Sequence, residues 1–186
     1  SPNSVVVNGD HTINANDYTN TGRIDIAGNL IMNITNNLIN DLGSLIYAGK
    51  DMFLNVVNNL TNKKDATIYA KDNLTIRKYD PNHASYNSSD NNINQLDNLT
   101  AKIEAQKNIN IYAKKLNNTG TNYDPDNGGH FGYNLKELVY KGGWGHGYYN
   151  LMNQDEIVST LRTTPAKITS GANINIFNSD RIIKLH

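Results

Sequence analysis

One pattern occurs three times between residues 22 and 79: GRIDIAGNLIMNITNNLIN (22–40), GSLIYAGKDMFLNVVNNLTN (43–62) and DATIYAKDNLTIRKY (65–79). Each copy has an alternating apolar run that ends in a small residue (Ala27, Ala48 or Ala70), a tight polar turn, and a second alternating run. Alternation with a period of two is typical of strands. The turn residues accept positive φ or hydrogen-bond their own backbone. The pattern therefore predicts strand, turn and strand in every copy.

An asparagine-flanked leucine follows the second run in the first two copies. Asn36, Asn37 and Leu38 are followed by Asn40, and the same spacing recurs in residues 58–62. We expect this motif at a fixed corner of the repeat, where asparagine side chains of successive copies hydrogen-bond along the stack.

The period of about 21 residues indicates a solenoid, because strands this short cannot bury a face alone and must stack on neighbouring coils. The strands are rich in Ile, Val, Tyr and Thr, which favours β-coils over helical ones. We therefore predict an all-β fold, a parallel β-helix in which each inward side chain lies about 4.8 Å from its counterpart in the next coil.

The repeat extends beyond these copies and is interrupted twice. Residues 1–21 predict an earlier coil, and the pattern returns in residues 99–118 and 165–177. Two stretches, about 79–97 and 119–164, are predicted insertions that both leave the solenoid by a Tyr-Asp-Pro turn. Residues 181–183 are predicted to begin another coil. The chain, residues 1–186, is interpreted as a single β-helix segment, and we expect it to belong to a longer protein because it has no initiator Met.

The second insertion differs in composition from the rest of the chain. It holds the only tryptophan, several other aromatic residues and a glycine-rich stretch at 142–147. Long insertions on solenoids often carry binding, and Tyr and Trp are favoured anchors at binding surfaces. The residues predicted to bind a receptor are Phe131, Tyr133, Trp144, His146, Tyr148 and Tyr149. The alternative is that the aromatic side chains form a satellite core on the flank of the β-helix. Asn153 is a suitable cap for a short helix over residues 155–161.

Charge, cysteine content and hydropathy argue against several classes of function. Lys plus Arg and Asp plus Glu number 17 each, so the formal net charge is zero, and we expect neither nucleic acid nor an anionic membrane as the main partner. The chain has no cysteine, which excludes disulfides and thiolate metal sites. No apolar run approaches the roughly 18 residues of a membrane span and no signal peptide is recognised, so membrane insertion is not expected.

Catalysis and metal binding are not expected either, and no cofactor is predicted. Lyases and hydrolases built on β-helices need clustered carboxylates or a basic residue on one face. Asp51, Asp65 and Asp72 instead fall at predicted turns, where Asx hydrogen bonding explains them. His130 and His146 lack the spacing of a paired metal-ligand motif.

The repeat, with its Ala-Gly turn and its Asn-Leu-x-Asn corner, resembles the haemagglutinin repeats of two-partner-secretion exoproteins (TpsA), the filamentous-haemagglutinin family. The return from the second insertion, STLRTTPAKITSGANINI (159–176), is similar to the region of contact-dependent growth inhibition effectors (CdiA) in which a non-repeat segment rejoins the repeats. Lys71 and Gln106 depart from the family's turn glycine, so looser coils are expected at these positions.

The resemblance implies a right-handed β-helical rod outside a Gram-negative cell, exported through an outer-membrane transporter of the TpsB type. It also implies a mid-rod segment that recognises a receptor on a neighbouring cell. We therefore expect a secreted, cell-surface segment that binds an outer-membrane protein or glycan receptor and performs no catalysis. A purely structural stalk and a carbohydrate-binding adhesin are the alternatives.

Overall fold

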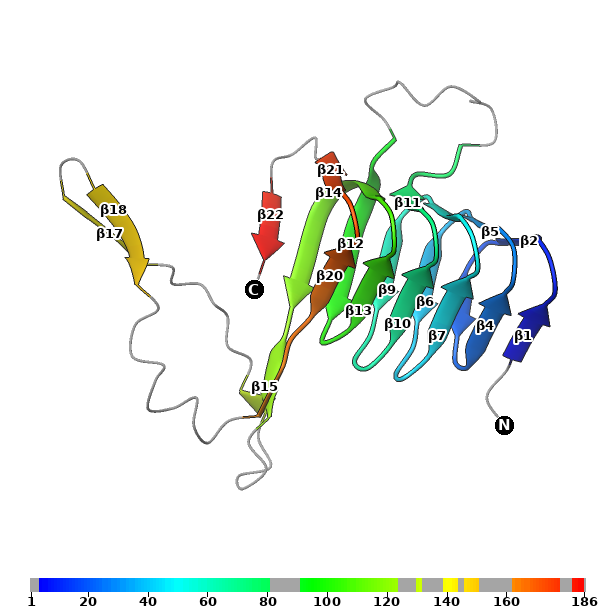
Figure 1. The fold of residues 1–186 in the computed structure, drawn as a ribbon, viewed down its shortest axis with the longest axis horizontal. Coiled ribbons are helices and arrows are strands. Elements are labelled where there is room, and N and C mark those ends of the chain that lie inside the picture. Colours follow the sequence, from blue (N-terminus) through cyan, green and yellow to red (C-terminus); the bar gives the residue numbers. More distant parts are fainter. Residues whose placement is uncertain are drawn as a thin grey trace.

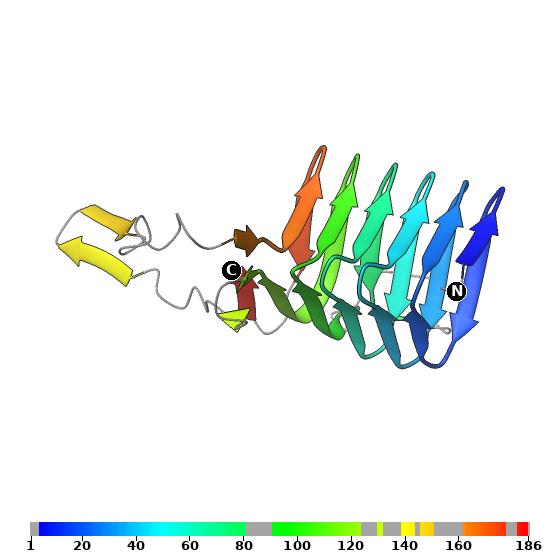
Figure 2. The same ribbon diagram turned by 90° about the horizontal axis from the view of Figure 1, so that it is seen from below.

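The computed structural model describes residues 4–80, 91–123, 130–131, 139–143, 146–150, 162–177 and 182–185. Over these residues the chain is entirely β and contains no helix. Parallel strands are stacked into successive coils along one axis (Figures 1 and 2). The predicted parallel β-helix is confirmed. The described residues include no helix that is long and apolar enough to cross a membrane.

Each coil contributes strands to three faces. The first face is a parallel sheet of β1 (Ser4–Val7), β4 (Arg23–Ile26), β7 (Leu45–Ala48), β10 (Thr67–Ala70), β13 (Lys102–Ala105) and β20 (Lys167–Ser170). The second face comprises β2 (His11–Ala15), β5 (Leu30–Ile34), β8 (Met52–Val56), β11 (Leu74–Arg77), the first part of β14 (Ile109–Thr119) and β21 (Ile174–Phe177). The third comprises β3 (Tyr18–Asn20), β6 (Asn37–Asn40), β9 (Asn59–Asn62), β12 (Ile93–Leu99), the last part of β14 and β22 (Ile182–Leu185).

The third face is a strand in each coil, where the sequence predicts only a corner. Asn37–Asn40 forms β6, and its Leu38 side chain is fully buried. A four-residue run with one inward aliphatic side chain carries little periodic signal, so the strand was missed. The prediction for the C-terminus was wrong for the same reason. Ile182 and Ile183 belong to β22, which pairs with the last part of β14 and so completes the final coil's third face.

Side chains on the first face stack in columns. Ile24, Ile46 and Ile68 occupy one inward column and are at most 1% exposed. The predicted alignment of Ala27 with Ala48 is off by one residue, because Ala48 pairs with Ile26. The second inward column of this face therefore begins with the larger Ile26 and continues with Ala48 and Ala70.

Coil length varies although the strands remain in register. Equivalent hydrogen-bonded asparagine and aspartate positions lie 19 residues apart at the N-terminal end, then 22, and 35 and 65 across the two insertions. Ile103 nevertheless pairs with Ile68 before it and Ile168 after it. The first insertion is shorter than predicted, since β12 begins at Ile93 and Leu96 pairs with Leu60. The sequence of β12, INQLDNL, is mostly polar and resembles a loop, which is why the predicted insertion extends into it.

A buried row of asparagine side chains runs through the third face. Asn20 Nδ2 donates to Asn40 Oδ1 at 2.8 Å, and the row continues through Asn62 and Asn98 to Asn118 at 2.9, 2.9 and 2.7 Å. Each of the first four amides also donates to a backbone carbonyl that starts a later strand of the first face, as Asn62 does to the Lys102 carbonyl at 2.9 Å. The predicted asparagine stacking is confirmed, and this row lies inside the core.

At the turns between the first and second faces, Gly28, Gly49 and Gly171 serve close packing and not positive φ, contrary to the sequence interpretation. Among the described residues only Gly43, Asp65 and Thr100 have positive φ. A Cβ on Gly49 would lie 2.2 Å from the Ala27 carbonyl oxygen, so glycine allows the coils to approach. The looser coils expected at Lys71 and Gln106 are not observed. Their amides donate to the preceding coil at 2.9 and 3.1 Å.

Candidate functional site

The second insertion leaves and re-enters the β-helix through adjacent antiparallel strands. β15 (Thr121–Tyr123) pairs with β19 (Arg162–Thr164), and β16 (His130–Phe131) pairs with the other edge of β15. Asn122 is the register partner of Thr163. The insertion is therefore attached to the coil by a paired stem.

A two-stranded ribbon lies within the insertion. β17 (Val139–Gly143) pairs antiparallel with β18 (His146–Asn150), and the register places Tyr140 opposite Tyr149 and Lys141 opposite Tyr148. In both views the ribbon is drawn away from the stacked coils (Figures 1 and 2).

The predicted receptor-binding residues are distributed between these two small sheets. Phe131 lies in β16, whereas His146, Tyr148 and Tyr149 lie together in β18. No strand pairing joins β16 to the ribbon among the described residues. Tyr133, Trp144 and the helix predicted over 155–161 lie outside the described residues. The backbone thus brings three of the predicted residues into one strand.

The two insertions leave the β-helix at different corners. The first leaves after β11 on the second face and returns before β12 on the third, with the Lys78 amide donating to the Asn91 carbonyl at 2.7 Å. The second lies between the end of β14 on the third face and β20 on the first. Figure 1 places β15 and the upper ends of β11 and β12 at opposite edges of the coils.

The turn carboxylates have structural partners. The Asp51 carboxylate accepts hydrogen bonds from the Asn73 backbone and side-chain amides, both at 3.0 Å. Asp72 forms an ion pair with Lys107 at 2.7 Å, and this hydrogen bond raises the pKa of the Lys107 ammonium group. Asp65 occupies a corner with φ of 61°. The described part of the chain contains no group of three His, Cys, Asp or Glu side chains that could hold a metal ion.

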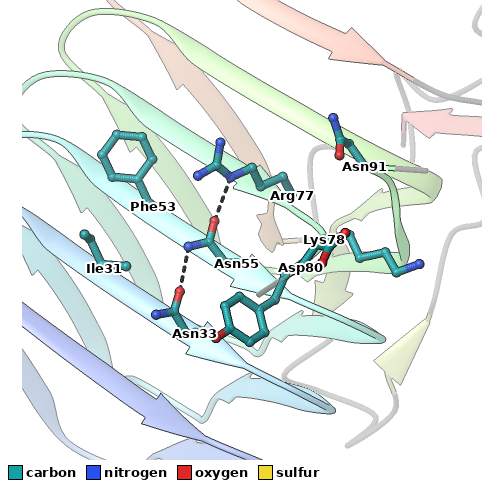
Figure 3. A pocket seen from close by; sticks show the side chains of 9 residues that line it. Ile31, Asn33, Phe53, Asn55, Arg77, Lys78, Asp80 and Asn91 are labelled. Atoms are coloured by element: carbon teal, nitrogen blue, oxygen red, sulfur yellow. Dashed lines mark hydrogen bonds between the residues drawn. The ribbon is translucent and has the colours of Figure 1, made fainter. Parts of the chain in front are cut away.

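A groove that the sequence did not predict lies on the outer side of the second face (Figure 3). Its volume is about 470 Å³. We call it the second-face groove, and it is lined by Ile31, Asn33, Phe53, Asn55, Arg77, Lys78, Tyr79, Asp80 and Asn91.

Three successive strands build the groove because coils of 22 residues place equivalent outward positions side by side. Ile31 pairs with Phe53, and Asn33 with Asn55, which in turn pairs with Arg77. The Arg77 guanidinium carbon lies 5.6 Å from the Phe53 ring centroid, a cation–π contact. Large apolar side chains at outward positions of successive repeats were the sequence signal for this groove.

A row of hydrogen bonds crosses the groove. Arg77 Nε donates to Asn55 Oδ1 at 2.7 Å, Asn55 Nδ2 to Asn33 Oδ1 at 2.8 Å, and Asn33 Nδ2 to Asn14 Oδ1 at 2.9 Å. Figure 3 shows Ile31 and Phe53 on one side of this row and Lys78, Asp80 and Asn91 on the other. The groove therefore combines an apolar floor with fixed amide groups.

Comparison of the chain with protein-family models, with curated proteins and with solved structures gave no match.

Proposed function

We propose that the chain is an extracellular β-helical segment of a secreted bacterial exoprotein, of the haemagglutinin-repeat and CdiA kind, that mediates contact between cells. In this proposal the β-helix is a shaft, and the insertion of residues 119–164 binds an outer-membrane protein or glycan on a neighbouring cell. The parent protein is exported by a TpsB-type transporter to the surface of a Gram-negative bacterium. The activity is binding without catalysis.

The way the insertion joins the shaft is the observation that carries this proposal. Lys102 of β13 pairs with Lys167 of β20, so the coils on either side of the insertion remain in register. The core columns continue across this junction, and the paired stem of β15 and β19 closes the insertion at its base. A segment that the shaft does not need for its core is free to serve recognition. Its content of Tyr and Trp favours a binding role.

A deletion tests the proposal. Replacing residues 123–162 by an Asn-Gly turn joins Asn122 to Thr163, which are already register partners. The intact chain should bind Gram-negative cells saturably, and the deletion variant should not, while its far-UV circular dichroism remains that of a β-helix. Deletion of residues 79–92 at the other corner removes most of the first insertion, which we expect to assist this contact, and should weaken binding without abolishing it.

Point variants then locate the contact. Trp144→Ala with Tyr149→Ala should abolish binding and preserve the β signal. Loss of the fold together with binding would assign these side chains to a satellite core. No binding by either chain would contradict the recognition proposal and favour a structural stalk. Equal binding by the intact and deleted chains would contradict it too, because the contact would then lie outside the insertion.

A further inference from the structure

We propose that the second-face groove is a separate binding site for a neutral, pyranose-containing glycan. The site lies on the shaft and uses no residue of the 119–164 insertion. It is therefore independent of the receptor-binding function proposed above.

The floor of the groove offers an apolar surface that could contact the apolar face of a pyranose ring. Ile31 and Phe53 occupy outward positions of β5 and β8 and remain partly exposed, whereas their strand neighbours Leu30, Met32 and Leu54 are fully buried. Pyranose rings have an apolar face of C–H groups and an edge of hydroxyl groups. Pockets for such amphipathic ligands combine aromatic or aliphatic walls with a few fixed polar groups.

The amide row supplies the polar groups. A primary amide has two N–H donors and two acceptor lone pairs, and the row uses one donor and one acceptor of Asn33. The remaining N–H and lone pair are complementary to a hydroxyl group, which also donates and accepts. The contacts with Asn14 and Asn55 fix the orientation of the amide before a ligand binds, which lowers the entropic cost of binding.

Other ligand classes match the lining less well. A purely apolar ligand would cover the amides without pairing them. An anion would face the amide carbonyls and the Asp80 carboxylate, and a cation would face Arg77 and Lys78. A hydroxyl-rich neutral ligand satisfies both signs of partial charge. The volume of about 470 Å³ lies within the range of about 300–1,000 Å³ typical of small-ligand sites and is sufficient for a short oligosaccharide.

The first experiment is a screen of the full chain on an array of neutral, carboxylated and sulfated oligosaccharides, with a thymidine oligonucleotide as a further probe. We expect signal on neutral glycans. The best-bound array oligosaccharide is then titrated by calorimetry into the intact chain and its variants. Phe53→Ala and Asn33→Ala should each weaken binding about five- to tenfold, since each removes about 1–1.4 kcal/mol of contact.

Two controls make the result specific to the groove. Tyr47→Ala removes an outward aromatic side chain from the first face, where it stacks on Tyr69 at 5.7 Å, and should leave glycan affinity unchanged. The variant that lacks residues 123–162 should also retain full glycan affinity. Phe53 and Asn33 point outward, so their replacement should leave the β-helix folded. Circular dichroism and the unfolding midpoint of each variant check this.

Several outcomes would overturn the proposal. These are no signal on neutral glycans, preferential binding of anionic glycans or the oligonucleotide, unchanged affinity in folded Phe53→Ala and Asn33→Ala variants, or loss of glycan binding with the 123–162 deletion. The last outcome would move the glycan site to the insertion and leave cell binding by the insertion intact, so the two proposals fail separately.

Discussion

The contact between Gly49 and the Ala27 carbonyl oxygen limits how closely two coils can stack. A Cβ at this position would lie 2.2 Å from that oxygen, which forces one turn to shift. We expect Gly49→Ala to destabilise the fold by about 1–3 kcal/mol, as overpacking does in protein cores. Gly9→Ala is the matched control, because its Cβ would meet nothing within 4 Å. Urea unfolding of the two variants measures the difference, and equal stability would contradict a packing role for Gly49.

The buried asparagine row predicts a second difference between similar residues. Asn62→Ala removes the acceptor of one Asn40 N–H group and the donor to both the Lys102 carbonyl and Asn98 Oδ1, so it interrupts the row in the core. The expected loss is about 1–3 kcal/mol. Asn59 lies in the same strand but is exposed, with its amide 3.1 Å from Asn37. Its replacement by Ala should cost less than about 0.5 kcal/mol. Thermal unfolding of both variants provides the comparison.

Asp17 gives the N-terminal coil a dependence on pH. Its carboxylate accepts a hydrogen bond from the Asn36 side chain at 2.7 Å, which lowers its pKa below the ordinary value of 3.8. A group whose pKa is lowered by folding stabilises the protein above its unfolded-state pKa, and the contribution is lost as pH falls through the folded-state value. We expect the temperature of the unfolding midpoint to decrease as the pH is lowered below about 4. Asp17→Asn should reduce this acid sensitivity, measured by thermal scans between pH 7 and pH 2.

At the scale of elements, strands with several inward aliphatic residues were predictable and those with one were not. Leu30, Met32 and Ile34 occupy alternate, inward positions of β5, a pattern that predicts a strand. In β6 the only inward aliphatic residue is Leu38, and the other inward residue, Asn40, is polar yet fully buried. Burial of Asn40 depends on amides from two other coils, and a local pattern contains no information on that stacking.

The first insertion should be removable without loss of the fold. Asn94 bonds to Asn58 across 36 residues where the neighbouring coils need 22. Deleting residues 79–92 would join Lys78 to Ile93 and restore a coil of that length. Since loop length contributes to stability only weakly, the free energy of unfolding should change by less than about 1 kcal/mol. A variant without cooperative unfolding or β circular dichroism would show that the insertion supports the fold.

At the scale of the whole molecule, each coil contacts chiefly its neighbours, so stability should decline toward both ends. The inward side chains Val5 and Ile13 of the first coil are only partly buried, and Ile174 of the last is 42% exposed. Leu54 in the middle is fully buried. Hydrogen exchange followed by mass spectrometry should find the slowest amides in β5, β8 and β11, and faster exchange in β1, β2 and β21. Uniform exchange would indicate that the coils unfold together.

The candidate sites differ in how far sequence alone could lead to them. The aromatic residues of the second insertion are evident from composition, and the backbone register now pairs Tyr140 with Tyr149. The second-face groove was not evident. Phe53 and Arg77 meet because a 22-residue coil brings outward positions of β8 and β11 together. The repeat period places these positions on neighbouring strands, but it does not show that the two side chains turn toward each other.

The amide dipoles of the buried asparagine row and of the outer asparagine row point in opposite directions along the axis of the β-helix. In the buried row every Nδ2 donates toward a later coil, from Asn20 to Asn40 onward, whereas Asn33 and Asn55 on the outer face donate toward an earlier one. Amide dipoles aligned head to tail add together, as they do along a helix. The rows at the turns and corners, such as Asn73 to Asp51 and Asn58 to Asn36, donate toward the earlier coil as well. The buried row therefore offsets part of the axial moment of the outer rows. Each coil added to such a rod changes the end-to-end dipole only by the difference between the two directions.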